Sequence, residues 1–308
     1  MSVTYEARLK QEIAHYERVF KGRMSQEVPP VWLKVEAHLA DRIKAATGVE
    51  NLYTYVARHV EGRRSIDVLG LGSGACGNEL DGIAPLLRSQ ECEFTLTCID
   101  VNEAALEQAN REASNRGVRF SRLVQDINQM QLEEQQYDVI VAYASLHHFL
   151  ALDHIAAEVN RALKPGGIFV TVDIPTRNGY LMWDETLEVV NALWRVLPPK
   201  YKIAHTGFSE PTFVPLYENI DYSTSSFECI NSEAILPALR SYLNEVVFVP
   251  ALSIARRFLD TRFGPNYDLS ESLDAAVFNF IMQMDVYYLQ KGILKPETFF
   301  GAYGKRSA

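Results

Sequence analysis

A glycine cluster directly behind a short apolar run is the feature that most constrains this chain. Residues 66–71 read Ile-Asp-Val-Leu-Gly-Leu and lead into Gly72-Ser-Gly-Ala-Cys-Gly, after which a helical pattern begins. This order predicts a buried strand, a tight turn and a helix. Glycine permits positive φ and a close approach of the backbone to a ligand, so the turn indicates a nucleotide-type binding site.

The glycine pattern alone leaves two classes of enzyme open. Gly72, Gly74 and Gly77 satisfy the G-x-G-x-x-G fingerprint of dinucleotide-binding proteins, and Asp100 follows at about the distance expected of a ribose-binding acid. A NAD(P)-dependent oxidoreductase and an enzyme that uses S-adenosylmethionine both fit these residues. The choice between them depends on the motifs on the C-terminal side of the turn.

Composition bounds the class of protein. A chain of 308 residues with 47% hydrophobic content can bury one large core, or one core and a smaller cap. The net charge of -9 argues against a nucleic-acid partner, because phosphate binding needs a basic surface. The four cysteines form no C-x-x-C pair, and no apolar run is long enough for a signal peptide or a membrane span. We therefore expect a cytoplasmic protein with reduced cysteines.

Strands and helices alternate over the first part of the chain. Strands are predicted over 66–71, 94–99, 119–124, 137–143 and 168–172, with two more over 245–249 and 298–303. The alternation requires parallel pairing with right-handed crossovers, which predicts an α/β doubly wound sheet. Ligands bind such sheets beyond the carboxyl ends of the strands, where Gly72, Asp100, Asp126 and Tyr143 would meet.

The remaining segments are expected to surround this sheet. Residues 1–60 are predicted as helices that either pack on the sheet edge or form a lid over the ligand. Residues 61–175 form the ligand-binding core, 176–244 an inserted helical cap for the substrate, and 245–308 the completion of the sheet. A long helix ending near Gly292 carries an apolar stripe on one face, formed by Leu269, Leu273, Val277, Phe280, Met284 and Tyr287.

Taken together, residues 64–175 resemble the class I S-adenosylmethionine-dependent methyltransferases, in particular the members that act on small molecules. Beyond the glycine turn and Asp100, the resemblance rests on motifs in a fixed order: Asp126-Ile127, Tyr137-Asp138, Leu146-His-His148 and Leu163-Lys-Pro-Gly-Gly167. A dehydrogenase accounts only for the glycine turn and Asp100. The resemblance implies a Rossmann-like methyltransferase fold with a mostly parallel, seven-stranded sheet.

The resemblance also implies which residues hold S-adenosylmethionine. Asp100 is expected at the ribose diol, Asp126 and Ile127 at the adenine, and the glycine turn at the methionine part. Most members end the first strand with an acid where this chain has Gly70. Glu79 is expected either to replace that acid or to be a solvated carboxylate at a helix N-terminus. The full set expected to bind the cofactor is Gly70, Gly72, Ser73, Gly74, Glu79, Asp100, Val101, Asp126, Ile127 and Tyr143.

The acceptor side is less constrained by the sequence. His147 and His148 follow the fourth strand and are candidates for a catalytic base, or for a structural turn. Substrate contacts are expected from Arg177, Tyr180 and Trp183. No metal site is predicted. Transfer to oxygen is favoured slightly over transfer to nitrogen or carbon, and biosynthesis of a specialised metabolite is the expected setting.

Two rival functions remain open from the sequence. One is the NAD(P)-dependent oxidoreductase. The other is a non-catalytic protein that binds S-adenosylmethionine and acts as a partner of another protein, since a fold does not prove turnover. The oligomeric state is not fixed by the sequence, and a homodimer is one possibility.

Overall fold

The computed structural model describes residues 5–20, 28–205 and 210–307, with the backbone alone for 15–20. Its centre is a seven-stranded sheet in the order β3-β2-β1-β4-β5-β9-β8. All strands run parallel except β9, which lies antiparallel between β5 and β8. The strand bounds are β1 Ser65–Leu71, β2 Glu93–Asp100, β3 Arg119–Val124, β4 Tyr137–Tyr143, β5 Leu163–Asp173, β8 Leu243–Ala251 and β9 Thr298–Lys305. The predicted doubly wound, mostly parallel sheet is confirmed.

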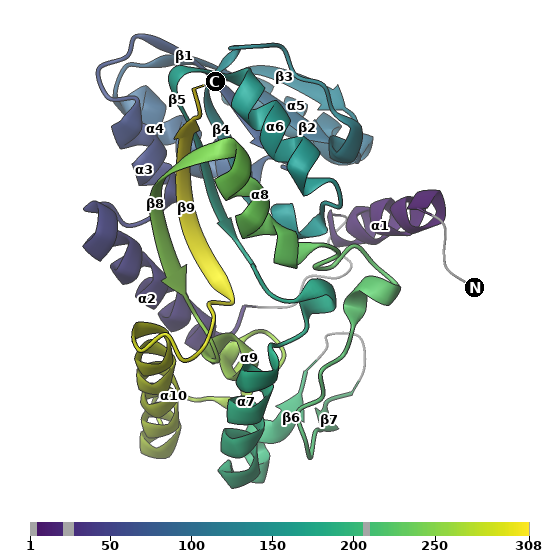
Figure 1. Cartoon of the computed structure of the whole chain (residues 1–308), viewed down its shortest axis with the longest axis vertical. Helices are drawn as coiled ribbons and strands as arrows, with labels where there is room; N and C mark the ends of the chain where they lie inside the picture. The colour runs from purple at the N-terminus through teal and green to yellow at the C-terminus, as the bar shows by residue number, and fades with distance from the viewer. Residues whose placement is uncertain (1–4, 21–27, 206–209, 308) are drawn as a thin grey trace.

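Helices cover both faces of this sheet (Figure 1). One face packs against α3 (Leu52–His59), α4 (Ala84–Ser89) and α5 (Glu103–Asn115), and the other against α6 (Leu152–Ala162) and α8 (Ile235–Tyr242). Successive side chains of a strand point to opposite faces, so the apolar run of β1 supplies both cores. Ile66 and Val68 lie in the first core, and Leu69 and Leu71 in the second.

A second group of helices lies beyond the ends of β5, β8 and β9. It contains α2 (Pro30–Thr47), α7 (Asp184–Val196), α9 (Ala255–Leu259), α10 (Ser272–Gln290) and the short strands β6 (Ile203–Ala204) and β7 (Thr212–Phe213), and Figure 1 shows most of it below the sheet. An aromatic cluster forms its core, in which the Trp194 ring lies 4.9 Å from Phe263 and 5.7 Å from Phe258. Helices α9 and α10 therefore pack with α7, while α8 packs on α6. The division of the chain into segments 1–60, 61–175, 176–244 and 245–308, each with its own function, stays a prediction.

The apolar stripe predicted for the long helix, α10, is only partly buried: Val277 and Met284 pack against the cluster around Trp194. Leu273, Phe280 and Tyr287 are exposed, whereas Asp274 and Asp285 are buried. The burial of Asp285 follows from its hydrogen bonds, since its Oδ1 accepts from the backbone N–H groups of 253, 254 and 255 at 2.6–2.8 Å. A carboxylate that accepts several backbone N–H groups can be buried without the usual cost. No helix in the described ranges is both long and apolar enough to cross a membrane.

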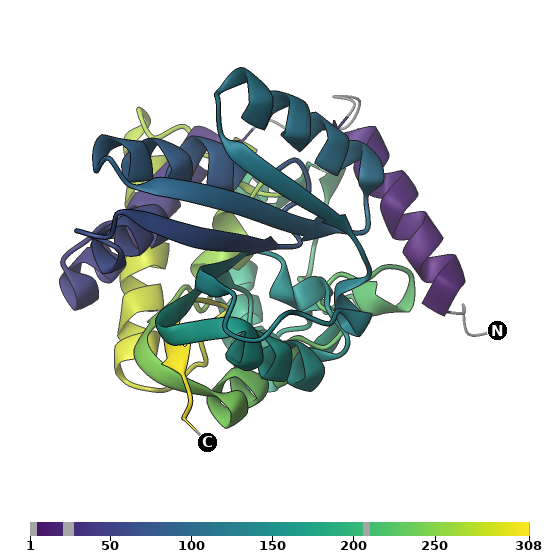
Figure 2. The ribbon, with the colours of Figure 1, turned by 90° about the horizontal axis from the view of Figure 1, so that it is seen from above.

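Helix α1 (Tyr5–Phe20) lies at the outer edge of the molecule in Figure 2. Its first described residue contacts the sheet's binding edge, because the Tyr5 hydroxyl donates to Asp126 Oδ2 at 2.7 Å. Leu9, Glu12 and Ile13 of the same helix line a cavity at that edge. Helix α1 therefore lies against this cavity, and the lid function of residues 1–60 stays a prediction.

Candidate functional site

The glycine turn after β1 forms one wall of a cavity of about 890 Å³, part of it open to solvent. Gly72 has φ +64° and Gly74 has φ +51°, in the left-handed region that favours glycine. A Cβ on Gly72 would lie 2.8 Å from the Phe149 ring, too close for any side chain. The N–H of Gly72 donates to the Ile99 carbonyl at 2.9 Å and fixes the turn to β2. Backbone therefore approaches the cavity where a side chain would block it.

Asp100 ends β2 beside this turn and lines the same cavity. Its Oδ2 accepts from the Gly74 N–H at 2.8 Å and its Oδ1 from the Asn102 N–H at 2.8 Å. Burial raises the pKa of Asp100 above its ordinary value. Each carboxylate oxygen can accept a second hydrogen bond, so Asp100 can still receive two hydroxyl donors from a ligand.

Glu79 lies next to Gly70, the position where most members of the resembled family carry an acid at the end of the first strand. Its Oε1 accepts from the Ser73 hydroxyl at 2.7 Å, and its Oε2 is buried without a hydrogen-bond partner among the described residues. A Cβ built on Gly70 would lie 2.6 Å from Glu79 Oε1, so this carboxylate fills the space in front of Gly70. Burial raises the pKa of Glu79. The solvated alternative is excluded, since the residue is 4% exposed.

The far end of the cavity is formed by Asp126, Ile127 and Asn128 after β3. Asp126 Oδ1 accepts from the N–H of Asn128 at 2.9 Å and from its side-chain amide at 3.0 Å. Its Oδ2 accepts from Tyr5 at 2.7 Å and from Gln129 at 3.2 Å. Because a carboxylate has about four acceptor positions, Asp126 is saturated by donors of this chain.

The loop after β4 places two histidines at the other end of the cavity. Asp173, at the end of β5, accepts from the N–H groups of Ser145 and Leu146 at 3.0 and 2.7 Å. The same carboxylate lies 2.7 Å from His147 Nδ1. Burial lowers the pKa of His147, but the adjacent Asp173 outweighs burial and raises it above its ordinary value. Asp173 therefore orients both the turn and the imidazole.

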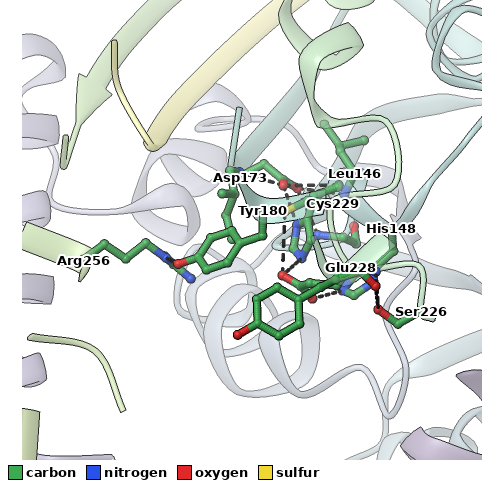
Figure 3. A network of polar contacts seen from close by, with 12 residues as sticks. Leu146, His148, Asp173, Tyr180, Ser226, Glu228, Cys229 and Arg256 are labelled. Atoms are coloured by element: carbon green, nitrogen blue, oxygen red, sulfur yellow. Dashed lines mark hydrogen bonds and ion pairs between the residues drawn. The ribbon is translucent and has the colours of Figure 1, made fainter. Parts of the chain in front are cut away.

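Glu228, in the irregular segment before α8, lies beside His148, as Figure 3 shows, and contacts both histidines. His147 Nε2 lies 3.9 Å from Glu228 Oε1, and His148 Nε2 lies 3.8 Å from Glu228 Oε2. His148 Nδ1 lies 3.3 Å from Glu12 Oε1 of α1. His148 lines the cavity of the glycine turn, and Glu228 lines a second cavity together with Tyr180, Tyr217, Tyr222 and Arg257. The histidine cluster thus lies between two cavities.

The structure brings most of the predicted site residues together. Gly72, Ser73, Gly74, Asp100, Val101, Asp126, Ile127 and His148 line one cavity. Tyr143 is absent from its lining, and its ring lies 6.1 Å from that of Tyr53. Of the predicted substrate residues, Tyr180 lines the second cavity, whereas Arg177 pairs with Asp184 at 2.9 Å and Trp183 lies under Lys295.

Two residues of the cluster were not predicted. Glu228 follows a stretch without regular periodicity, and Glu12 is one of many charged residues on α1, so neither carries a sequence signal. Asp173 does carry a sequence signal for a site residue, because it ends a parallel strand as Asp100 does. The prediction of no metal site is not tested, but two groups of ligand-type side chains occur among the described residues: Cys76, Glu79 and Cys98, and His147, His148 and Glu228.

A doubly wound sheet with a glycine turn, two strand-end acids and one cavity defines a protein that binds a nucleotide-like ligand at its carboxyl edge. The comparison with known families narrows this class. Residues 69–171 match the family described as "Methyltransferase domain". The resemblance to the methyltransferase family is therefore confirmed over this part of the chain.

Relatives in sequence agree with that assignment over part of the chain. The chain is 30% identical over 139 residues to sterol 4-C-methyltransferase strm-1 of Caenorhabditis elegans, covering 44% of this chain and 40% of that protein. It is 28% identical over 139 residues to phthiotriol/phenolphthiotriol dimycocerosates methyltransferase 1 of Mycobacterium ulcerans, covering 44% and 48%. Both matches span less than half of the relative.

The fold comparison extends over nearly the whole chain. The crystal structure of a putative sarcosine dimethylglycine methyltransferase from Galdieria sulphuraria aligns with a TM-score of 0.50 and 12% identity, covering 95% of this chain and 98% of the other. At this identity the alignment shows a shared fold, including the elements outside residues 69–171.

Proposed function

We propose that this chain is an S-adenosylmethionine-dependent methyltransferase that acts on a small molecule. The observation that carries the proposal is the convergence of the glycine turn, Asp100 and Asp126 on one cavity, with the partnerless Glu79 oxygen behind the turn. The names of both relatives refer to small-molecule acceptors, a sterol and a phthiotriol lipid. The net charge of -9 likewise supports a small acceptor over a nucleic acid.

The residues present fit this cofactor group by group. Its ammonium needs buried acceptors, and Glu79 Oε2 is buried with no partner among the described residues. Its ribose diol needs two acceptors, which Asp100 retains. Its adenine amine needs an acceptor, and Asp126 supplies one once the Tyr5 hydroxyl withdraws. S-adenosylmethionine supplies an activated methyl group on a sulfonium; the chain's residues must hold the acceptor in line with it and exclude water.

Glu79 also argues against the NAD(P) alternative. A dinucleotide places its pyrophosphate against the glycine turn and the following helix N-terminus. In this chain that helix begins with a buried carboxylate, 2.7 Å from the hydroxyl of Ser73 in the turn. A second anion close to this poorly solvated carboxylate would be repelled. A ligand with an ammonium group is attracted to the same place.

We assign the acceptor end to His147 and His148. Asp173 accepts a hydrogen bond from His147 Nδ1, so in the neutral imidazole the lone pair is on Nε2. This lone pair points toward His148 and Glu228 and could receive the proton of the acceptor. The acceptor would enter through the cavity lined by Tyr180, Tyr217 and Tyr222. An oxygen acceptor, a specialised metabolite and a cytoplasmic location complete the proposal.

Binding and turnover test the proposal separately. Calorimetry with adenosylhomocysteine and with NADH is expected to show micromolar or tighter binding of the first and none of the second. A panel of phenols, aromatic acids and amines is then screened for substrate-dependent formation of adenosylhomocysteine. Tight NADH binding without adenosylhomocysteine binding would refute the proposal. Binding without product from any acceptor class would support the non-catalytic binding protein instead.

A further inference from the structure

The two histidines present the same ring nitrogen to one carboxylate. His147 Nε2 and His148 Nε2 lie 3.9 and 3.8 Å from the two oxygens of Glu228, and their ring centroids lie 4.2 Å apart. One ligand-type atom from each of the three residues lies within 4.8 Å of the others. Two imidazole nitrogens and a carboxylate are a ligand set for divalent transition metals.

The opposite nitrogens of both rings face carboxylates. Asp173 Oδ1 lies 2.7 Å from His147 Nδ1, and Glu12 Oε1 lies 3.3 Å from His148 Nδ1. A carboxylate hydrogen-bonded to the far nitrogen, as Asp173 is to His147 Nδ1, fixes the tautomer and makes Nε2 the available ligand atom, as is usual for metal-binding histidines. One oriented histidine would be enough for a base. Here a second histidine, adjacent in the chain, also presents its Nε2 to Glu228.

The charge balance favours a cation at the same place. Three carboxylates, those of Glu12, Asp173 and Glu228, surround two imidazoles. The side chains of His147 and Asp173 are 5% and 0% exposed, so water screens this charge poorly. With both imidazoles neutral, two lone pairs and a carboxylate face one another across 3.8–3.9 Å. A cation between them turns this repulsion into three attractive contacts.

We propose that His147, His148 and Glu228 bind one divalent transition-metal cation of the Zn²⁺ type. Ligand atoms about 2.1 Å from a tetrahedral cation lie about 3.4 Å apart. The ligand-type atoms of the three side chains lie within 4.8 Å of one another, so each pair has to close by at most about 1.4 Å. The site deepens the proposed function and rests on it for its role. With three protein ligands the cation would keep one position for an acceptor oxygen and lower the pKa of its hydroxyl, so that the proton would leave to water. His147 and His148 would then act as ligands in place of a base.

Zinc binding to the metal-free full-length protein tests the site. After treatment with a chelator and dialysis, calorimetry with Zn²⁺ is expected to show one equivalent bound. Glu228→Gln and His148→Gln should each weaken binding at least 100-fold, and Asp173→Asn roughly 10- to 100-fold, as expected of a residue that orients a ligand. Glu185→Gln, the same change on an exposed carboxylate of α7, should leave zinc binding unchanged.

Two further measurements test the proposed metal site: adenosylhomocysteine binding, as a check on folding, and the position of zinc in a crystal. Glu228→Gln, which lies outside the cavity of the glycine turn, is expected to bind adenosylhomocysteine as the wild type does, which shows that this variant is folded and keeps the test apart from the cofactor assignment. A wild-type crystal soaked in Zn²⁺ should give an anomalous peak between the three side chains, whatever the variants do. A peak elsewhere only, or equal zinc affinity of wild type and Glu228→Gln, would overturn the site while leaving the proposed methyltransferase intact.

Discussion

Replacing Glu79 by glutamine isolates one contact of the proposed cofactor site. The side chain keeps its size, and its amide oxygen can still accept from the Ser73 hydroxyl, now 2.7 Å from Oε1. The change removes the negative charge and gives the buried Oε2 position a hydrogen-bond donor. An amide donor cannot pair with an ammonium, which only donates. The methionine part of the cofactor should therefore lose its charged partner, while the adenosine part keeps all its contacts.

The size of the effect follows from the burial of the group. A hydrogen bond to a charged group contributes about 1.5–3 kcal/mol, which corresponds to roughly 10- to 150-fold in affinity. Glu79 is 4% exposed, so the upper half of this range is expected. Affinity for adenosylhomocysteine should fall by about this factor. Affinity for methylthioadenosine, which has no amino-acid part, should change less than threefold.

The same substitution has a second, opposite effect on the unliganded protein. Burial raises the pKa of Glu79, so the folded state binds its proton more tightly than the unfolded chain does. Stability is then lost as pH rises from the ordinary value through the raised one, and the loss is complete above it. At neutral pH, Glu79→Gln should therefore be at least as stable as the wild type in urea unfolding. Wild-type adenosylhomocysteine binding should weaken as pH falls through the raised pKa, and this dependence should be smaller in the variant.

Calorimetry with the two ligands decides the matter. Equal losses for adenosylhomocysteine and methylthioadenosine would show that the substitution disturbs the whole cavity and that the ammonium assignment is wrong. Unchanged binding of both ligands would refute the contact itself.

Three further substitutions test other parts of the structure. Asp100→Asn should weaken both adenosylhomocysteine and methylthioadenosine roughly tenfold or more, because both carry the ribose; calorimetry that shows a loss for one ligand only would contradict the ribose assignment. Gly70→Ala should destabilise the fold by about 1–3 kcal/mol in urea unfolding, since its Cβ would lie 2.6 Å from Glu79 Oε1. Glu297→Gln should cost about 3–5 kcal/mol, because it leaves the buried guanidinium of Arg257, now 2.6 Å from Glu297, without its counter-charge; a neutral result in thermal or urea unfolding would show that water reaches this pair.

The sheet could be predicted because its signal is local. Each buried strand is a short apolar run, and the acid at its end, Asp100 for β2, stands at a fixed place relative to that run. Pairing order then follows from the crossover rule. The start of β5 was missed, since Lys164-Pro-Gly-Gly167 has turn composition, yet β5 runs from Leu163. Pairing with β4 stops after Leu163 and resumes at Ile168, and Gly166 between them has φ +75°, so a turn-type residue does lie within the bounds of β5.

The acceptor end and the helical cap could not be predicted in the same way. Glu228 meets His147 only because an irregular segment far along the chain folds back over the loop after β4. On α10, apolar spacing indicated one face, but Asp285 is buried by three backbone N–H donors from the segment after β8. Such long-range partners leave no periodic trace in the sequence. Contacts of this kind are recognised only in the folded structure.

The contact between Tyr5 and Asp126 has a practical consequence for anyone producing this protein. In the proposed complex, adenine has to displace the tyrosine hydroxyl from a carboxylate whose acceptor positions are already full, so cofactor affinity would include the free energy of moving Tyr5 away from Asp126. An affinity tag on the N-terminal side of Tyr5 is expected to act on that equilibrium. Kd values should therefore be compared before and after such a tag is removed.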